Sequence, residues 1–524
     1  MAGRREPLTA GSRAGTWAGG VALALVLALV LGTLAAVALR AEAGAGFGPA
    51  DWAAVRFTLG QALISALLSV VLAVPVARAL ARRRFFGRSA LITLLGAPFI
   101  LPVIVAVLGL ISVFGRNGIV SHLLIWAGLE PVSIYGAHGV VLAHVFFNLP
   151  LATRLILQGW LAIPAERFRL AASLGFGPGD VARVLERPML REVAPGAFVV
   201  IFILCLTSFA VALALGGGPR ATTIELAIYQ AFRFDFDLGK AALLGLVQVA
   251  IAGTAAVLAL RLALPADLGA GLDRAVKRWD AATPFLKLQD ALAIGLATLF
   301  LALPLAMIAI DGGAALMTLP GSVWLATLRS IAVALASMAL TMALALPIAV
   351  LAVRRRARIV EVLATLTIAA SPLVVGTGLF VMLFPLIDPA RVALGVTALV
   401  NAAMALPFAL RALVPALAGV EADYGRLADG LGMTGRTRLF RLWLPRLRRP
   451  IGFAAGLAAA LSMGDLGVIA MFASPEGGTL PLALYRLMGA YRMGDAAGAA
   501  LILLAVSLAL FWIFDRGGRV DADA

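Results

Sequence analysis

Long apolar runs alternate with short basic segments along almost the whole chain. A helix needs about 20 mainly apolar residues to cross a bilayer core of about 30 Å. Strands of a membrane barrel are not indicated, because they alternate apolar and polar residues over only about ten positions. The pattern predicts an all-α polytopic membrane protein with about twelve transmembrane helices, at 17–39, 57–81, 89–114, 133–160, 194–215, 240–262, 289–310, 323–353, 359–387, 392–417, 451–473 and 495–514.

The composition agrees with a membrane protein and excludes an ordinary soluble one. Hydrophobic residues make up 62% and charged residues 13% of the 524 positions, compared with about 45–50% and about 25% in soluble proteins. A soluble fold of this composition would expose large apolar patches. The net charge of +16 could indicate a nucleic-acid partner, but no polar stretch is long enough to form a soluble basic domain. We therefore expect membrane lipid, and no nucleic acid, as a partner.

The basic residues also predict the orientation in the membrane. If the N-terminus lies in the cytoplasm, the segments on the cytoplasmic side hold 33 of the 43 Lys and Arg residues. Short cytoplasmic loops of membrane proteins are the ones enriched in Lys and Arg. Both termini are therefore expected in the cytoplasm.

A block of the first half recurs 257 residues later. Each half holds six predicted helices, so both halves would enter the membrane in the same direction, as parallel repeats related by an axis along the membrane normal. We predict a first repeat at 1–262, a cytoplasmic linker at 263–288 and a second repeat at 289–524, with a longer outer loop near 115–132 in the first. The recurring residues are Leu149-Pro150, Arg154, Arg169-Leu170-Ala171, Leu174-Gly175 and Pro188, matched by Leu406-Pro407, Arg411, Arg426-Leu427-Ala428, Leu431-Gly432 and Pro445.

Two predicted cytoplasmic segments, 161–192 and 418–449, share one spacing. In each, a short helix is expected to end at a glycine, Gly175 or Gly432, which adopts the left-handed conformation of a helix C-terminus at little steric cost. Twelve residues follow, and then Pro188 or Pro445. Ordinary basic loops that anchor helices would explain one such segment, whereas recurrence on the same membrane side favours a shared docking function.

These two segments resemble the coupling loop of ABC-importer permeases, E-A-A-x3-G-x9-I-x-L-P. The glycines and prolines match, Leu185 and Leu442 stand at the isoleucine position, Arg169 and Arg426 replace the glutamate, and Arg187 stands where leucine is usual. The resemblance implies that the loops dock on an ATPase subunit and transmit its closure to the membrane helices. The implied coupling residues are Arg169, Leu170, Ala171, Gly175, Leu185, Pro188, Arg426, Leu427, Ala428, Gly432, Leu442 and Pro445.

Longer strings are similar to the fused permeases of thiamine/thiamine pyrophosphate importers, among them 148–155, 215–223, 232–237 and 462–468. The resemblance implies the type I ABC-importer permease fold in a bacterial inner membrane. It also implies two copies of an ATPase subunit that bind ATP and Mg, a periplasmic binding protein that delivers thiamine or thiamine pyrophosphate, and no cofactor on this chain. Permeases of iron(III) importers share the fused design and are the closest alternative.

The chain lacks the sequence signatures of an enzyme. No G-x-x-x-x-G-K-[ST] phosphate loop is present, so ATP hydrolysis is expected on a separate subunit. Its three histidines show no metal-ligand spacing, so no metal site and no catalytic residue are expected. A secondary transporter driven by an ion gradient would also have two parallel halves, but it usually needs buried ionisable residues, and the predicted helices offer chiefly Asp465.

Asp465 and its counterpart at the 257 offset, Ser208, are candidates for the translocation path or a gate. A carboxylate within a membrane helix costs a few kcal/mol unless it faces protein or water. One hypothesis is that Asp465 accepts hydrogen bonds that hold a gate helix in place. The other is that it lines the path and offsets the positive thiazolium ring of a thiamine-like substrate.

Overall fold

The structure is a computed structural model that describes residues 13–41, 47–96, 100–261, 278–280, 282–355, 367, 370–474 and 477–518. Helices are the regular structure throughout these ranges, with no β-strand among them. Eleven helices are long and apolar enough to cross a membrane. The prediction of an all-α polytopic membrane protein is confirmed.

The eleven helices differ from the twelve predicted runs at one place. The run predicted at 359–387 contains only the 12-residue helix α16 (Pro372–Leu383) among described residues, and 359–366 lie outside them. Most of the predicted linker, 263–277 and 281, also lies outside the described residues, and the next helix, α13, begins at Pro284.

The helices of the first half are α1 (Arg13–Arg40), α2 (Pro49–Arg82), α3 (Arg88–Leu94), α4 (Val103–Phe114), α5 (Ile119–Trp126), α6 (Ala137–Ala162), α7 (Ala165–Ser173), α8 (Pro178–Val181), α9 (Arg187–Leu206), α10 (Ala210–Leu215), α11 (Ile224–Arg233) and α12 (Leu238–Arg261). Those of the second half, besides α16, are α13 (Pro284–Ala315), α14 (Gly321–Arg355), α17 (Pro389–Gly430), α18 (Gly435–Arg438), α19 (Leu444–Arg446), α20 (Arg448–Met463), α21 (Gly467–Phe472), α22 (Leu480–Gly489) and α23 (Met493–Gly517).

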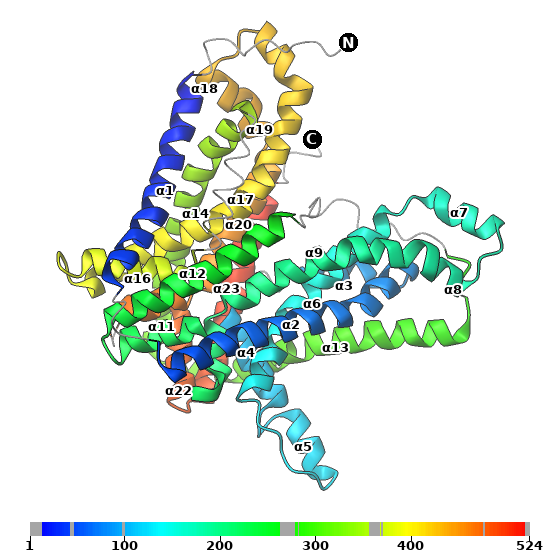
Figure 1. Cartoon of the computed structure of the whole chain (residues 1–524), viewed down its shortest axis with the longest axis horizontal. Helices are drawn as coiled ribbons and strands as arrows, with labels where there is room; N and C mark the ends of the chain where they lie inside the picture. The colour runs from blue at the N-terminus through cyan, green and yellow to red at the C-terminus, as the bar shows by residue number, and fades with distance from the viewer. Residues whose placement is uncertain are drawn as a thin grey trace.

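Two lobes diverge from a common base, and each lobe takes its first helix from the other half of the chain (Figure 1). The first hydrophobic core packs α1 with helices of the second half, including α14, α16 and α17. The second core packs α13 with α2 and α4 of the first half, and α13 also packs along α23 of its own half. The lobes are therefore tied together by two exchanged helices, an arrangement that the apolar pattern of the chain did not predict.

Glycines allow the exchanged helices to pack closely at their crossing points. A Cβ atom added to Gly109 on α4 would lie 2.6 Å from the carbonyl oxygen of Pro304 on α13. A Cβ added to Gly378 on α16 would collide with the carbonyl of Thr33 on α1 in the same way. Small residues bring helix backbones together where lipid offers no hydrophobic driving force for association.

The segment near 115–132, where a longer loop was predicted, contains α5. In Figure 1 this helix projects from the base of the molecule. The corresponding connection in the second half is the short segment between α16 and α17, at 384–388.

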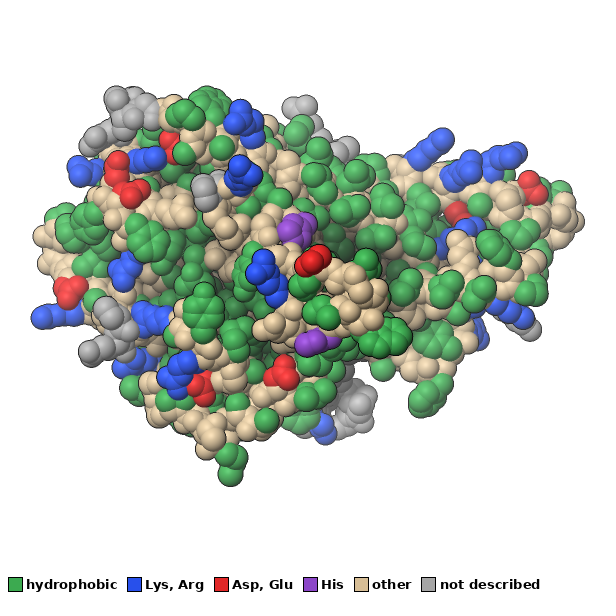
Figure 2. Space-filling model, turned by 90° about the horizontal axis from the view of Figure 1, so that it is seen from below, with side chains coloured by type: hydrophobic (Ala, Val, Ile, Leu, Met, Phe, Trp, Pro, Cys, Tyr) green, Lys and Arg blue, Asp and Glu red, His purple; other side chains and the backbone are tan. Residues whose placement is uncertain are grey.

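Figure 2 views the molecule from below and shows apolar side chains over much of this face, with most charged side chains toward its margins.

Candidate functional site

The two segments that resemble coupling loops lie at the tips of the two lobes (Figure 1). In the first, α7 is a separate short helix after the break at Ile163-Pro164. In the second, the equivalent residues continue α17 without a break as far as Gly430. Gly175 and Gly432 have φ values of +71° and +63°, so the expected left-handed conformation is present in both segments.

The predicted coupling residues have matching exposure in the two segments. Leu170 and Leu427 are both 61% exposed, and Leu174 and Leu431 are both 62% exposed. Arg169 and Arg426 are also exposed, whereas Ala171 and Ala428 are buried against the rest of their lobes. Each segment therefore presents two leucines and an arginine outward, and the buried alanine on the other side packs against the rest of its lobe.

Each segment then forms one turn of π-helix before its proline. Arg187 N–H donates to the carbonyl of Ala182, and Leu444 N–H donates to that of Leu439, five residues back in both cases. The ring of a proline clashes with the carbonyl four residues before it in a regular α-helix. The wider turn accommodates Pro188 and Pro445, both exposed, while Leu185 and Leu442 are partly buried.

A buried arginine of the linker holds the first coupling segment. The guanidinium of Arg278 donates to Asp280 at 2.6 and 2.7 Å and to Glu186 at 3.0 Å, and it lies 4.6 Å from the ring of Phe168 on α7. Glu186 also pairs with Arg78 of α2 at 2.8 Å. Burial alone would raise the pKa of Asp280, but Arg278 lowers it below its usual range. The linker therefore fixes α7 against the ends of α2 and α9.

The second coupling segment holds itself together with its own arginine. Arg438 donates to both carboxylate oxygens of Glu421 at 3.1 and 2.6 Å and to Asp429 at 2.6 Å. Trp443 donates to Glu421 at 2.5 Å, and Arg354 stacks over the Trp443 ring at 5.1 Å. The two segments thus present similar outer surfaces on different supports.

The membrane helices that follow the coupling segments are broken at the predicted path residues. The run predicted at 194–215 divides into α9 and α10 around Ser208, and the run predicted at 451–473 divides into α20 and α21 around Asp465. The second of these predicted spans is still one candidate membrane span, Arg448–Phe472, with the break inside it. A broken helix leaves backbone carbonyls without partners, and such carbonyls must be satisfied inside a membrane.

Two glutamines satisfy the carbonyls at the first break. Gln61 of α2 donates to the carbonyl of Cys205 at 3.0 Å, and Gln248 of α12 donates to that of Leu206 at 2.9 Å. Both glutamines are buried. Hydrogen bonds from two neighbouring helices, α2 and α12, therefore stabilise the C-terminal end of α9 where its own hydrogen bonding stops.

Asp465 faces the beginning of α21. It lies two residues before this helix, and Asn401, from α17, donates to the hydroxyl of Ser462 three residues before Asp465 at 3.0 Å. The Oδ2 atom of Asp465 is buried without a hydrogen-bond partner among the residues that the structure describes. Leu466 is the N-cap residue of α21, and no described side chain caps that helix by a hydrogen bond, so both hypotheses for Asp465 stay predictions. Ser208 lies at the other break but does not cap α10.

Comparison with known proteins places the chain in a family. No family model matches it. The chain is 42% identical to the thiamine transport system permease protein ThiP of Brucella abortus (strain 2308), over 97% of this chain and 96% of that protein. It is 40% identical to the protein of the same name from Salmonella typhimurium, over 89% of each chain. It is 39% identical to the one from Escherichia coli (strain K12), over 90% of each chain.

The chain belongs to the family of thiamine transport system permease proteins. The resemblance to fused ABC-importer permeases is thereby confirmed, and the chain is a multi-pass permease of the inner membrane.

Several residues of this permease that position the candidate site were not predicted from the sequence. Arg278 lies in the linker, and its partner Glu186 does not belong to the recurring set of residues. Gln61 and Gln248 are single polar residues within apolar runs. A buried side-chain amide in a membrane helix needs a hydrogen-bond partner. The two glutamines could therefore have indicated that a neighbouring helix has free backbone carbonyls.

Proposed function

We propose that this permease is the membrane subunit of an ATP-driven importer that carries thiamine or thiamine pyrophosphate, delivered by a periplasmic binding protein. Two copies of an ATPase subunit, which bind ATP and Mg, would dock on the coupling segments. Both termini and the coupling segments would face the cytoplasm. The relatives are named as thiamine transport permeases, which supports the substrate, and the similarity extends over almost the whole chain, which supports the same role for this protein.

One observation carries the docking proposal. Two segments far apart in the chain expose an identical pair of leucines, Leu170 with Leu174 and Leu427 with Leu431, at the tips of the two lobes. Exposed large apolar groups in matched positions are typical of an interaction surface. Two such surfaces suit two copies of one partner.

The shape of the molecule suggests how docking would drive transport. The lobes diverge from the base toward the coupling segments (Figure 1). ATPase subunits that close on ATP would draw the two tips together, and the lobes would rock about their common base. The substrate path would then open alternately on the two sides of the membrane.

Charge substitutions on the coupling surface test the proposal. Leu170→Asp or Leu427→Asp would place an unpaired carboxylate in an apolar interface, at a cost of a few kcal/mol, or about 100-fold in affinity. We expect loss of ATPase co-purification and of ATP-driven thiamine uptake. Leu123→Asp on α5, 60% exposed at the opposite end, is the matched control and should keep the ATPase bound.

The same preparation separates the alternatives. Thiamine uptake that persists without the ATPase subunit, and collapses with the proton gradient, would indicate a secondary transporter. Transport of ferric ion in place of thiamine would reassign the substrate. Reporter fusions after residues 175 and 432 should be cytoplasmic, and fusions near 120, 225 and 480 periplasmic. An external signal from either coupling segment would contradict the docking proposal.

A further inference from the structure

Helices α11 and α22 lie near the base of the molecule, away from the coupling segments (Figure 1), and together with α10 they line a cavity of about 260 Å³. Its walls come from both halves of the chain: Leu213 on α10, Tyr229 and Gln230 on α11, Phe234 just after α11, and Tyr485 on α22. Pockets for small molecules usually measure about 300–1,000 Å³. A cavity slightly below that range suits a small, flat ligand or part of one.

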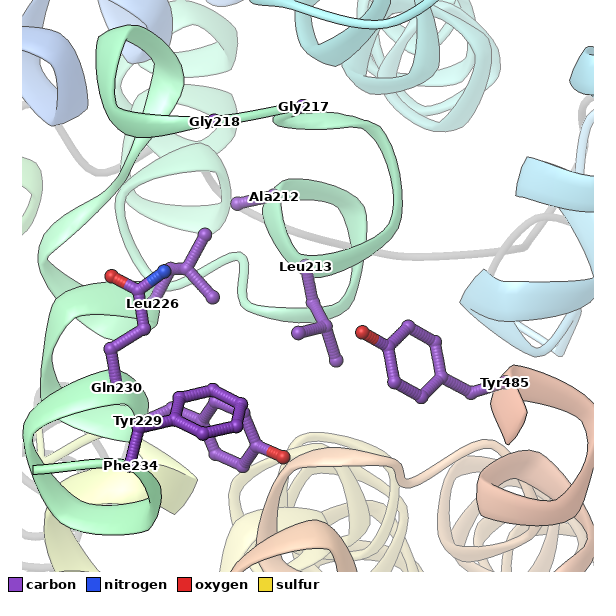
Figure 3. Close-up of a pocket in the computed structure, with 9 residues that line it drawn as sticks. All are labelled: Ala212, Leu213, Gly217, Gly218, Leu226, Tyr229, Gln230, Phe234 and Tyr485. Atoms are coloured by element: carbon purple, nitrogen blue, oxygen red, sulfur yellow. The ribbon is translucent and has the colours of Figure 1, made fainter. Parts of the chain in front are cut away.

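Two tyrosines occupy equivalent places on opposite sides of this cavity. Tyr229 and Tyr485 each stand six residues after the threonine that precedes its helix, Thr223 before α11 and Thr479 before α22. Figure 3 shows their hydroxyl ends pointing toward the space between them, with Leu213 beside that space. The two halves thus contribute one tyrosine each to a single cavity.

The cavity combines aromatic faces with neutral hydrogen-bonding groups. The ring of Tyr229 lies 5.3 Å from that of Phe209 and 6.0 Å from that of Phe234, edge-on to both. Burial raises the pKa of both tyrosine hydroxyls, so they remain protonated and keep their donor hydrogens. Neither hydroxyl has a hydrogen-bond partner in the part of the chain that the structure describes.

The cavity runs from an exposed rim to a buried floor. Phe234 at the rim is 74% exposed, whereas Tyr229 is 8% exposed. None of the nine residues that line the cavity carries a charge. The positive charges of Arg233 and Arg486 act on the Tyr229 hydroxyl from nearby, and Arg486 is held by the carbonyls of Gly477 and Ser474.

We propose that this cavity binds the nitrogen-containing aromatic rings of thiamine on their way through the permease, with Tyr229 and Tyr485 as the contacting pair. The inference rests on the proposed function and names a binding site for its substrate. Electron-poor and positively charged rings bind well to the faces of tyrosine. The two hydroxyls and the Gln230 amide supply hydrogen bonds to ring nitrogens and an exocyclic amino group. A phosphate tail would extend past the rim toward Arg233.

Protection of an introduced thiol tests the site directly. The full-length permease has one native cysteine, Cys205, which is buried, so Leu213→Cys provides one accessible thiol and leaves all the aromatic rings in place. Thiamine and thiamine pyrophosphate should each slow its reaction with a small membrane-impermeant thiol reagent. Adding Tyr485→Leu should raise the half-protecting concentration about tenfold. Adding Tyr485→Phe, which keeps the ring, should raise it less.

The controls separate this inference from the proposed function. Leu123→Cys on α5 is exposed but distant from the cavity lining, and thiamine should not protect it. Stronger protection by thiamine pyrophosphate than by thiamine would indicate that the phosphate groups lie near Arg233. If the wild-type permease transports thiamine but L213C is not protected, or Y485L leaves protection unchanged, the binding site is refuted alone. If the wild-type permease does not transport thiamine with its partners present, both the proposed function and the thiamine-binding site are refuted.

Discussion

Replacing Arg278 with methionine should release the first coupling segment and leave the second in place. The Arg278 side chain is 2% exposed and lies between the carboxylates of Glu186 and Asp280, which are 3% and 0% exposed. Methionine keeps much of the length of arginine but removes its charge and every donor. Both carboxylates would then be buried without their main partner, although Glu186 keeps its contact with Arg78.

The expected size of the effect follows from the burial of the network. Removing one partner of a buried ion pair costs about 3–5 kcal/mol. About 1.4 kcal/mol corresponds to a factor of ten in an equilibrium constant. The equilibrium constant between the attached and the released conformation of the segment should therefore fall by at least about 100-fold. The membrane helices remain packed in the Arg278→Met variant, so the loss should appear as local opening of 165–186 and not as global unfolding.

Hydrogen exchange of the permease in lipid nanodiscs measures this opening. Amide exchange in 165–176 should accelerate by about 100-fold in Arg278→Met, and ATP-driven uptake should fall because one docking surface is lost. Arg438→Met is the matched variant in the other segment and should accelerate exchange in 421–446 instead. Adding Glu186→Gln and Asp280→Asn to Arg278→Met removes the unpaired charges and should restore part of the protection.

Two results would refute this reasoning. One is unchanged exchange in 165–176 after Arg278→Met, which would mean that the buried ion pairs do not hold α7. The other is equal acceleration in both segments after either substitution, which would mean that their supports are not independent.

Three further substitutions test other parts of the structure. Gly175→Val forces a β-branched residue to a φ of +71°, an unfavourable conformation; membrane insertion should be normal and uptake lost, and normal uptake would argue against a coupling role. Gly109→Ala should lower the melting temperature in detergent, because its Cβ would lie 2.6 Å from the carbonyl oxygen of Pro304, whereas Gly60→Ala, with open space around it, should not. If Asp465 has a structural role, Asp465→Asn should keep assembly and most uptake, because asparagine nearly keeps the shape and hydrogen bonding of aspartate while removing its charge; loss of thiamine uptake in the correctly assembled Asn variant would support the path hypothesis.

The sequence predicted local features of the coupling segments well. The positive φ of Gly175 and Gly432 followed from the need of a helix C-terminus for a left-handed residue, and both have it. The resemblance named Leu170 and Leu427 as coupling residues, and the structure shows that both are exposed. Features of this kind depend on neighbouring residues in the chain, so their signals are local.

The supports of those segments could not be predicted in the same way. Arg278 reaches Glu186 across 92 positions, and nothing in the linker distinguishes it from the other basic residues there. The breaks around Ser208 and Asp465 lie in runs that read as continuous apolar helices. They are stable because Gln61, Gln248 and Asn401 approach from other helices, and a single run holds no information about which helices will be its neighbours.

The amino-acid sequence by itself determined that the chain lies in a membrane as a set of helices, because apolar runs of sufficient length have no other stable state there. The tertiary structure decided which helix packs with which. The exchange of α1 and α13 between the lobes depends on shape at the crossing points, where Gly109 and Gly378 let backbones approach. Lipid is as apolar as leucine, so hydrophobicity drives helices into the membrane but does not choose their partners. That choice is made by packing and by buried polar contacts, and both exist only after the chain has folded.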